Sequence, residues 1–525
     1  MALLKNKYLL SFLLGIIGCL ALAPYNFSLL ILPSIAGLYW LLTPLDSQKQ
    51  RRTAFFIGMI YALGYFVLGL YWIGNAVIVH WEDYWWAYPF AVFGIPLVLS
   101  LFWGIASLLT IVLSRENSLS RTFLFIALLS TFEWIRGWIF TGFPWNLPGY
   151  AWNGVLEVAQ LSAIGGIYFL TLFTVLVSTL MAHGLRNKQI PYFFVAVFLV
   201  ILCYGLGSLR LYAYNGGPTG ERSYSKQDGV LIVQPNIPQK DKWVPSLVPN
   251  HLSKLIELST YTPEQHTDIP EQSLQIIWPE TAMSSPYFEH PYYRKKITEA
   301  LQSWPVKTSL ISGVLHRESI DGQEEDRARY YNAIYNIDQG GEVIGRYNKR
   351  HLVPFGEYIP FIPEDILMPM NIASFTAGKA ENSSFVDSSK MFPLICYEVI
   401  FPRQMMGEDV LESLNTAKAL VTVTNDAWYA DAPGPYQHHA MARFRAIEQG
   451  LPLYRSANTG ISGAYDSVGQ DLGQRIGYGI RKTEMLFSPI SLNKQTLFAK
   501  YGNLIFFSTL SILYFLFMVL KKKPY

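Results

Sequence analysis

Charged side chains are scarce in this sequence. They make up 15% of its 525 residues, whereas 51% are hydrophobic. Ordinary soluble proteins carry about 25% charged residues, so the scarcity indicates that part of the chain is embedded in a membrane. Long runs of Lys or Arg are also missing, and the formal net charge is only +3. The chain therefore lacks the basic track that binds a phosphate backbone, and nucleic acid is not expected as a partner.

The hydrophobic residues are concentrated in runs of membrane-spanning length, which is about 17 to 25 residues. The first run follows Lys5 and Lys7, as in a signal peptide. The next begins just after Pro24 with no clear cleavage site between them, so we expect the first run to be retained. We expect eight membrane-spanning helices, at residues 8–22, 27–42, 54–77, 90–113, 121–140, 164–181, 192–209 and 504–520.

The distribution of Lys and Arg predicts how these helices are oriented, because both residues are retained on the cytoplasmic side in short loops. The short loops around Tyr25, at residues 80–88 and at residues 141–162 contain neither residue, whereas the alternate loops all do. The N- and C-termini are therefore expected in the cytoplasm. The expected domains are a membrane domain at residues 1–209, an extracytoplasmic domain at 210–502 with its core at 228–489, and a last helix with a basic tail at 503–525.

Two opposite charges interrupt one of the hydrophobic runs. Glu133 and Arg136 lie three residues apart within residues 121–140. An unpaired charge there costs about 2.5 to 3.5 kcal/mol on insertion scales. The two side chains can pair with each other or line a groove for a lipid headgroup, and their close spacing favours the pair.

Cysteine is nearly absent. Cys19 and Cys203 lie in hydrophobic runs, so Cys396 has no second cysteine in the extramembrane segment with which to form a disulfide. Exposed thiols outside the cytoplasm usually pair, because that compartment is oxidising. A lone thiol there is either buried and inert or kept for chemistry, and the cysteine count leaves both readings open.

From Asp228 onward, short hydrophobic runs alternate with turn residues and amphipathic stretches. This is the pattern of a globular α/β domain, in which helices cover sheets of nearly continuous hydrophobic strands. Helices are expected at residues 251–258, 292–302 and 436–449. Strands are expected at 229–234, 274–278, 309–314, 330–337, 392–396, 419–424, 453–457 and 485–489.

Three segments place reactive side chains at or near strand ends. Glu280 follows the strand at 274–278, Lys349 lies in the charged segment after residue 346, and Cys396 ends the strand at 392–396. Taken singly, Glu280 reads as a solvated strand end and Lys349 as a surface lysine. A Cys, a Lys and a Glu form a catalytic set if these strand ends converge.

In this order, the three segments resemble the motifs of the carbon–nitrogen hydrolase (nitrilase) superfamily, whose catalytic Glu, Lys and Cys lie on an α-β-β-α sandwich. The resemblance covers about residues 228–489. With the hydrophobic segments on either side, the whole chain resembles the bacterial apolipoprotein N-acyltransferase family, the membrane-bound branch of that superfamily. One departure is Pro393, where many soluble relatives carry a small residue.

The resemblance implies a role for each motif residue. Cys396 is expected to be the nucleophile, Glu280 the base that accepts its proton, and Lys349 the cation that stabilises the oxyanion. Glu357 is expected to orient Lys349 or assist proton transfer. Further supporting or substrate-binding positions are Trp243, Asn332, Tyr397 and Glu398.

The resemblance also implies the reaction and its setting. An acyl group is expected to pass from the sn-1 position of a membrane phospholipid, through a thioester, to the α-amine of an S-diacylglyceryl-cysteine lipoprotein, the last step of lipoprotein maturation. The implied location is the bacterial inner membrane, with the catalytic domain in the periplasm. No cofactor or metal is expected; His438 and His439 are adjacent, so on a helix they face different directions.

Two other functions remain open. A membrane-anchored amidase or nitrilase would use the same three residues with water as acceptor, although it needs at most one anchoring helix. A non-catalytic receptor or transporter with a degenerate domain fits the hydrophobic runs but not the intact catalytic set. The apolar stretch at residues 358–370 suits an entrance for lipid, or it packs on the core of its own domain.

Overall fold

The computed structural model describes residues 6–46, 49–79, 81–116, 118–217, 224–319, 328–360, 374–379, 384–402, 408–489 and 495–521. The chain divides into two units, each assembled from more than one segment of the chain. Unit 1 contains Met1–Gly217, Ala432–Gly450 and Lys494–Tyr525. Unit 2 contains Pro218–Asp431 and Leu451–Asn493.

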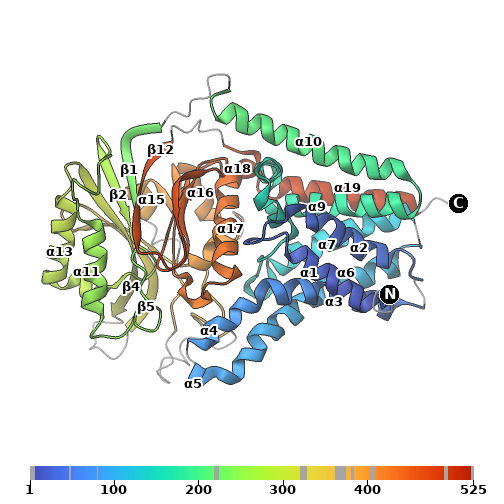
Figure 1. Ribbon diagram of the computed structural model, residues 1–525, viewed down its shortest axis with the longest axis horizontal. Coiled ribbons are helices and arrows are strands. Elements are labelled where there is room, and N and C mark those ends of the chain that lie inside the picture. The colour runs from blue at the N-terminus through green and yellow to red at the C-terminus, as the bar shows by residue number, and fades with distance from the viewer. Residues whose placement is uncertain are drawn as a thin grey trace. The chain divides into compact units, whose positions relative to one another are not determined.

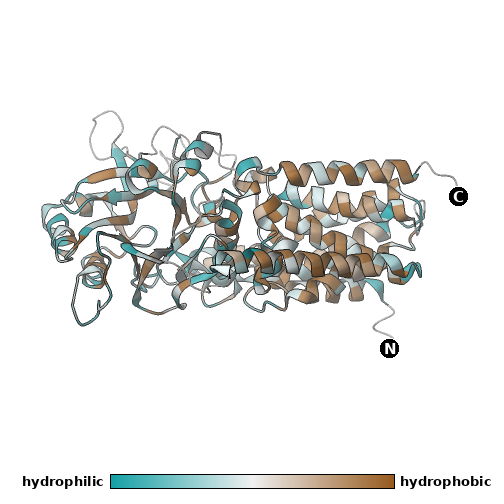
Figure 2. Ribbon diagram, turned by 90° about the horizontal axis from the view of Figure 1, so that it is seen from above, coloured by the Kyte–Doolittle hydropathy of each residue, from teal (hydrophilic) through white to brown (hydrophobic). Residues whose placement is uncertain are grey.

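Unit 1 is built from helices (Figure 1), and hydrophobic residues run along most of them (Figure 2). Its longer helices are α1 (Lys7–Cys19), α2 (Ile31–Leu42), α3 (Arg51–Leu70), α6 (Ile95–Leu113), α7 (Leu119–Arg136), α9 (Ser162–Arg186), α10 (Ile190–Tyr214), α17 (Pro433–Gln449) and α19 (Leu504–Lys521). Shorter ones are α4 (Gly74–Ile78), α5 (Trp81–Tyr84), α8 (Leu156–Ala159) and α18 (Leu497–Tyr501). A helix therefore lies in each of the eight places where a membrane span was predicted.

Within the described residues, five helical segments are long and apolar enough to cross a membrane: Arg51–Ile78, Trp81–Leu113, Ser162–Arg186, Ile190–Tyr214 and Leu504–Lys521. Helices α1 and α2 are shorter, with 13 and 12 residues. The predicted helix at 121–140 was too long, because α7 ends at Arg136 and the backbone turns with positive φ at Phe140 and Thr141. The number of helices that cross the membrane stays a prediction.

Small residues let the helices of unit 1 approach closely, as is common where helices pack in a membrane. A Cβ atom added to Gly15 of α1 would lie 1.9 Å from the carbonyl oxygen of Tyr61 of α3. One added to Gly64 of α3 would lie 2.3 Å from the carbonyl oxygen of Phe12. Any larger residue at either glycine would push the two helices apart.

Glu133 and Arg136 form a buried ion pair, with 2.6 Å between Oε2 and Nη2. The indole N–H of Trp103 also donates to Glu133, at 2.8 Å. Nη1 of Arg136 donates to the carbonyl oxygens of Phe143 and Trp145, at 2.7 and 2.8 Å. The favoured prediction of a structural pair is therefore confirmed, and the pair fixes the loop that follows α7.

The helix predicted at residues 436–449 is present as α17, and it packs among the helices of unit 1. The indole N–H groups of Trp72 and Trp145 donate to Oε1 of Gln437, at 3.2 and 2.8 Å. The backbone of α9 is broken at Gly166, where φ is +76°. The N–H of the next residue, Ile167, donates to Oε1 of Glu448 at 2.8 Å, so α17 supplies the hydrogen-bond acceptor that the break in α9 requires.

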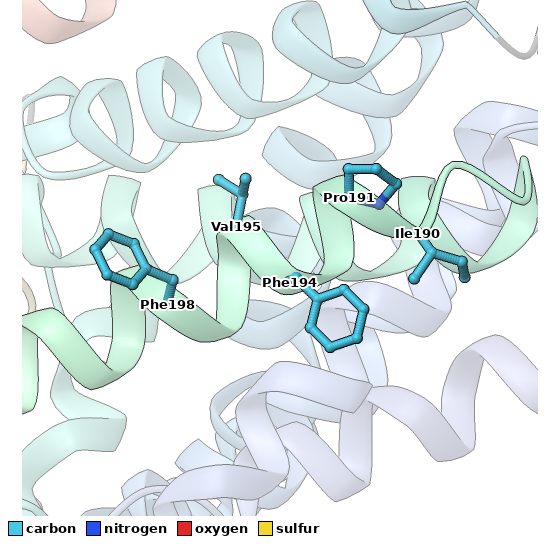
Figure 3. Close-up of a pocket in the computed structure, with 5 residues that line it drawn as sticks. All are labelled: Ile190, Pro191, Phe194, Val195 and Phe198. Atoms are coloured by element: carbon cyan, nitrogen blue, oxygen red, sulfur yellow. The ribbon is translucent and has the colours of Figure 1, made fainter.

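A hollow of about 530 Å³ on unit 1 is apolar. Its lining residues all belong to the first turns of α10 (Figure 3): Ile190, Pro191, Phe194, Val195 and Phe198. A surface of this kind suits the acyl chains of a bilayer. It contains no group that could take part in acyl transfer.

The described part of unit 2 forms two sheets. Strands β12, β1, β2, β4, β5 and β6 follow one another in the first sheet, with β3 beside β4, and β11, β10, β9, β8 and β7 form the second. The first sheet contains β1 (Tyr224–Gln234), β2 (Ser273–Ile277), β3 (Met283–Ser284), β4 (Lys307–Ser319), β5 (Ala328–Ile337), β6 (Val343–Asn348) and β12 (Lys482–Pro489). The second contains β7 (Met391–Ile395), β8 (Ala419–Thr424), β9 (Leu453–Ala457), β10 (Ser462–Tyr465) and β11 (Asp471–Ile476).

The core of unit 2 has two parts. Residues on one face of the first sheet, such as Ile232 and Ile311, pack with Ile395 and Val421 of the second sheet. The opposite face of the first sheet packs against α11 (Val248–Ser259) and α13 (Pro291–Gln302), which lie side by side (Figure 1). The remaining helices are α12 (Ser285–Glu289), α15 (Phe385–Ser389) and α16 (Glu408–Thr416). The expected α/β domain with sheets facing each other is confirmed.

Each of the eight predicted strands is present, but two end earlier than expected. The strand predicted to include Cys396 ends at Ile395, because Cys396 has a φ of +49°, outside the range of a strand. The strand predicted to include Trp278 ends at Ile277. Strands β3, β6, β10 and β11 were not predicted, since they are short or rich in polar residues and glycine.

Candidate active site

The ends of three strands converge in unit 2 and bring together Glu280, Lys349 and Cys396. Lys349 directly follows β6, Cys396 directly follows β7, and Glu280 lies three residues after β2. All three are buried, with exposed fractions of 1% for Lys349 and 7% for each of the others. Nζ of Lys349 lies 3.9 Å from Oε1 of Glu280, and the charges of both groups act on the Cys396 thiol.

The backbone at Glu280 depends on a glycine in the neighbouring strand. A Cβ atom added to Gly313 of β4 would lie 2.6 Å from Cα of Glu280 and 2.4 Å from the carbonyl oxygen of Pro279. Thr281, the next residue, has a φ of +44°. The N–H of Ala282 then donates to the carbonyl oxygen of Gly313 at 2.9 Å. The absence of a side chain on Gly313 therefore allows the turn that directs Glu280 into the site.

Glu357 holds Lys349 in place. Nζ of Lys349 lies 2.8 Å from Oε2 of Glu357 and donates to Oε1 at 2.9 Å. The N–H of Val353 donates to the same carboxylate at 2.8 Å. Burial lowers the pKa of Lys349, but the negative charges of Glu357 and Glu280 outweigh it and leave the pKa above its ordinary value. Lys349 is therefore a fixed cation and not a proton acceptor.

Asn332 of β5 joins the two carboxylates. Its side-chain amide donates to Oε1 of Glu280 at 2.7 Å and to Oε1 of Glu357 at 2.9 Å. The backbone carbonyl oxygen of Asn332 accepts from the backbone N–H of Lys349 at 2.8 Å. The sequence named Asn332 as a supporting position, and the structure places it at the centre of the site.

The Cys396 thiol is neutral in the resting site. Burial raises its pKa, the charge of Glu280 raises it further, and Lys349 opposes them without reversing the direction. The φ of +49° is unusual for a residue that is not glycine, and such strain is often found at reactive positions. The thiol therefore needs a proton acceptor at the moment of attack.

Glu398 joins the Cys396 turn to the Lys349 segment. Its Oε2 accepts from the N–H of Ile395 at 2.8 Å. Its Oε1 accepts from the hydroxyl of Tyr347 at 2.8 Å and from the N–H groups of Arg350 and His351, at 2.9 and 3.2 Å. Burial raises the pKa of Glu398, and these hydrogen bonds oppose the shift. The contacts fit a supporting position, because both oxygens of the carboxylate already accept hydrogen bonds from groups of the protein.

The other two predicted positions, Trp243 and Tyr397, differ in their exposure to solvent. Trp243 is 47% exposed. Tyr397 is buried, and its ring lies 5.1 Å from that of Phe401 and 5.7 Å from that of His351. Most of the apolar stretch at 358–370 lies outside the described residues. Among the described residues, no group of three or more His, Cys, Asp or Glu side chains could hold a metal ion.

Two features of the site were missed by the sequence reasoning. Lys242 is buried, and its Nζ donates to the carbonyl oxygen of Glu280 at 2.9 Å. A hydrogen bond between the Thr424 hydroxyl and Cys396 lowers the pKa of the thiol, against the larger effect of burial. The same hydroxyl donates to Oδ1 of Asp426 at 3.0 Å. Oδ2 of Asp426 forms a fully buried ion pair with Arg455, at 2.7 Å. Nothing local in the sequence identifies Arg455, 29 residues away, as the partner of Asp426.

The family of the chain follows from two models that match most of its length. The apolipoprotein N-acyltransferase N-terminal domain matches residues 14–180, and the carbon–nitrogen hydrolase domain matches residues 238–472. The apolipoprotein N-acyltransferase of Allorhizobium ampelinum is 36% identical over 489 residues, which cover 89% of this chain and 87% of the relative. The chain belongs to the apolipoprotein N-acyltransferase family. This confirms the family expected from the motifs.

A second relative matches nearly the full length of the chain. The apolipoprotein N-acyltransferase of Rickettsia bellii is 34% identical over 517 residues, which cover 97% of this chain and 96% of the relative.

Among solved structures, an amidase from Nesterenkonia is similar to the chain, with 14% identity, a TM-score of 0.34, and coverage of 55% of this chain and 98% of the amidase.

Proposed function

We propose that this bacterial membrane protein transfers a fatty acyl group from a phospholipid to the N-terminal α-amine of a lipoprotein that carries an S-diacylglyceryl cysteine. The observation that carries the proposal is the buried set of Cys396, Lys349 and Glu280 in a chain whose relatives are named apolipoprotein N-acyltransferase over nearly their whole length. The apolar helices of unit 1 support a substrate that resides in a bilayer.

In the first half-reaction, Sγ of Cys396 attacks the carbonyl carbon of the sn-1 ester while Glu280 accepts the thiol proton. The ammonium group of Lys349 stabilises the oxyanion, a type of contact worth about 3 to 4 kcal/mol. When the tetrahedral intermediate collapses, the C–O bond to the lysophospholipid breaks and Glu280 returns the proton to the leaving alkoxide. A thioester remains on Cys396.

In the second half-reaction, the lipoprotein amine attacks the thioester carbonyl and loses a proton to Glu280. The second oxyanion forms beside Lys349, and the C–S bond breaks when this intermediate collapses. The Cys396 thiolate then recovers the proton from Glu280, and the acyl group leaves as an amide. Glu357 and Asn332 keep the cation and the base in place throughout, through the hydrogen bonds described above.

Transfer to an amine is favoured over transfer to water. A membrane-anchored hydrolase needs at most one anchoring helix, whereas five helices long and apolar enough to cross a membrane lie among the described residues. We further propose that the segment 210–502, which contains all of unit 2, lies on the periplasmic side of the inner membrane. The loops at 80–88 and 141–162, which lack Lys and Arg, support this orientation.

The proposal is tested by supplying the purified protein with a phospholipid labelled in its sn-1 chain and with a diacylated lipopeptide. We expect the label in a triacylated peptide, and no product from Cys396→Ala. Release of free fatty acid that the peptide does not change, with no triacylated product, would instead indicate a hydrolase.

A further inference from the structure

Lys242 is a buried cation that the proposed mechanism does not use. Its Nζ donates to the carbonyl oxygen of Glu280 at 2.9 Å; burial lowers its pKa, and the negative charges of Glu280 and Cys396 oppose that shift. It precedes Trp243, an exposed residue whose ring lies 5.7 Å from the same Nζ. A charge of this kind is costly to bury, so its position needs a compensating interaction in the site.

The interaction that compensates the charge of Lys242 is with the charged groups around Glu280. Glu280 is a buried carboxylate and the side chain of Glu357 is 10% exposed, whereas Lys349 and Lys242 are two buried ammonium groups. Transfer of the proton from Cys396 to Glu280 leaves the number of charges unchanged but places the negative charge on sulfur. Without Lys242, the same step would occur beside one cation and an uncompensated carboxylate.

We propose that Lys242 is a positioning residue of the active site: its ammonium group fixes the backbone of Glu280 and supplies the second positive charge beside which the Cys396 thiolate forms. The inference rests on the proposed function for the reaction that it assists. It adds a residue to the site that acts through Glu280 and Cys396 without contacting substrate.

The surroundings of Lys242 predict a pH dependence. Burial lowers its pKa to about 8, against the opposing charges of Glu280 and Cys396. His251 of α11 also faces this segment, with Asp241 and Lys254 acting on its ring, and burial lowers the pKa of His251. Because the ordinary pKa of histidine is about 6.5, His251 is already neutral at about pH 8. A loss of activity at about pH 8 therefore indicates that Lys242 has lost its proton.

The test compares Lys242→Met, Lys242→Arg and the control Lys240→Met, which removes an exposed lysine two residues away. The rate of thioester formation on Cys396 is followed by intact mass between about pH 6 and pH 10. We expect Lys242→Met to slow it by about 10- to 100-fold, the range for a misplaced catalytic group, and Lys240→Met to leave it unchanged.

The pH profiles separate a charge from a packing role. The wild type should lose rate as the pH rises through about 8, because Lys242 loses its proton. Lys242→Arg should recover part of the rate and keep it above this pH, since a guanidinium stays charged. A wild-type rate and profile in Lys242→Met would overturn the proposal, as would an Arg variant no faster than the Met variant.

A second assay needs no lipid. Alkylation of Cys396 by iodoacetamide, located by peptide mass spectrometry, should be slowed in Lys242→Met and unchanged in Lys240→Met. Lys242-dependent alkylation without any phospholipid thioester in the wild type would refute the acyl-transfer function and support the role of Lys242. Alkylation that is independent of Lys242, together with a normal thioester in the wild type, would support the acyl-transfer function and refute the role of Lys242.

Discussion

Nζ of Lys349 lies 2.8 Å from Oε2 of Glu357, in a site where both side chains are nearly excluded from solvent. The same nitrogen lies 3.9 Å from Glu280. The two carboxylates are therefore not equivalent: Glu357 pairs closely with the lysine and Glu280 does not, which supports the proposed role of Glu280 as the proton acceptor. This division follows from the segment after β6, which carries both Lys349 and Glu357.

Glu357→Gln should slow thioester formation by about 10- to 100-fold, because Lys349 loses the partner that orients it. The charge of Glu357 raises the pKa of Lys349, so this pKa should fall in the variant. The ammonium is lost as pH rises, so in the Lys242→Arg background, where residue 242 stays charged, adding Glu357→Gln should make activity fall at a lower pH than in the parent. Rates measured against pH check this, with Glu342→Gln as an exposed control. Identical alkaline limbs would show that Glu357 does not control the charge of Lys349.

Asn332→Asp should impair the reaction more than Asn332→Ala. The amide of Asn332 donates to Glu280 and Glu357, and a third carboxylate in its place would repel both. Thioester yields of the two variants provide the measurement. Asn336→Ala is a matched control on the same strand, because its amide donates to Ser388 instead. Equal activity of the Asp and Ala variants would mean that repulsion between carboxylates is unimportant.

Glu398→Gln should destabilise the fold as well as slow the reaction. The neutral amide presents only one oxygen to the four donors that surround the carboxylate, and its NH₂ group opposes at least one of them. A buried donor without an acceptor costs about 1 to 3 kcal/mol. Thermal unfolding and thioester formation should therefore fall together. Full stability with no thioester would instead assign Glu398 a direct part in the chemistry.

Four substitutions separate the nucleophile, the base and the cation. Cys396→Ala should abolish the thioester, and Glu280→Gln should block it at neutral pH, because the pKa of the buried thiol is raised. Lys349→Ala should lose rate while it keeps lipid binding, since its contact is made mainly to the developing oxyanion. Lys349→Arg should not restore the rate, because a planar guanidinium does not replace a compact ammonium. Intact mass and lipid retention are the measurements; a normal thioester in Glu280→Gln would remove Glu280 as the base.

Much of this site could be predicted because its signals are local. A hydrophobic run before Glu280 and another before Cys396 are enough to place both residues at strand ends. Eight of the helices of unit 1 are likewise evident from the length of their apolar runs. The segment of β6 was not recognised as a strand, because its polar residues were read as part of the charged loop that contains Lys349.

What the sequence did not predict depends on partners that are far away in the chain. Lys242 and Lys240 both read as ordinary lysines, and only the contact with Glu280, 38 residues away, makes one of them buried. Asp426 pairs with Arg455 across 29 residues. The positive φ of Cys396 also depends on the hydrogen bonds of Glu398 that hold the turn, and not on any preference of cysteine.

The position of α17 constrains the order in which the protein can mature during synthesis. Its Glu448 accepts the hydrogen bond from Ile167 in α9, yet the residues of unit 2 from 218 to 431 lie between these two helices in the chain. When α9 leaves the ribosome, its acceptor has not been translated. The helical unit must therefore wait in an incomplete form until most of the catalytic unit has been made, and the last helix, α19, follows later still.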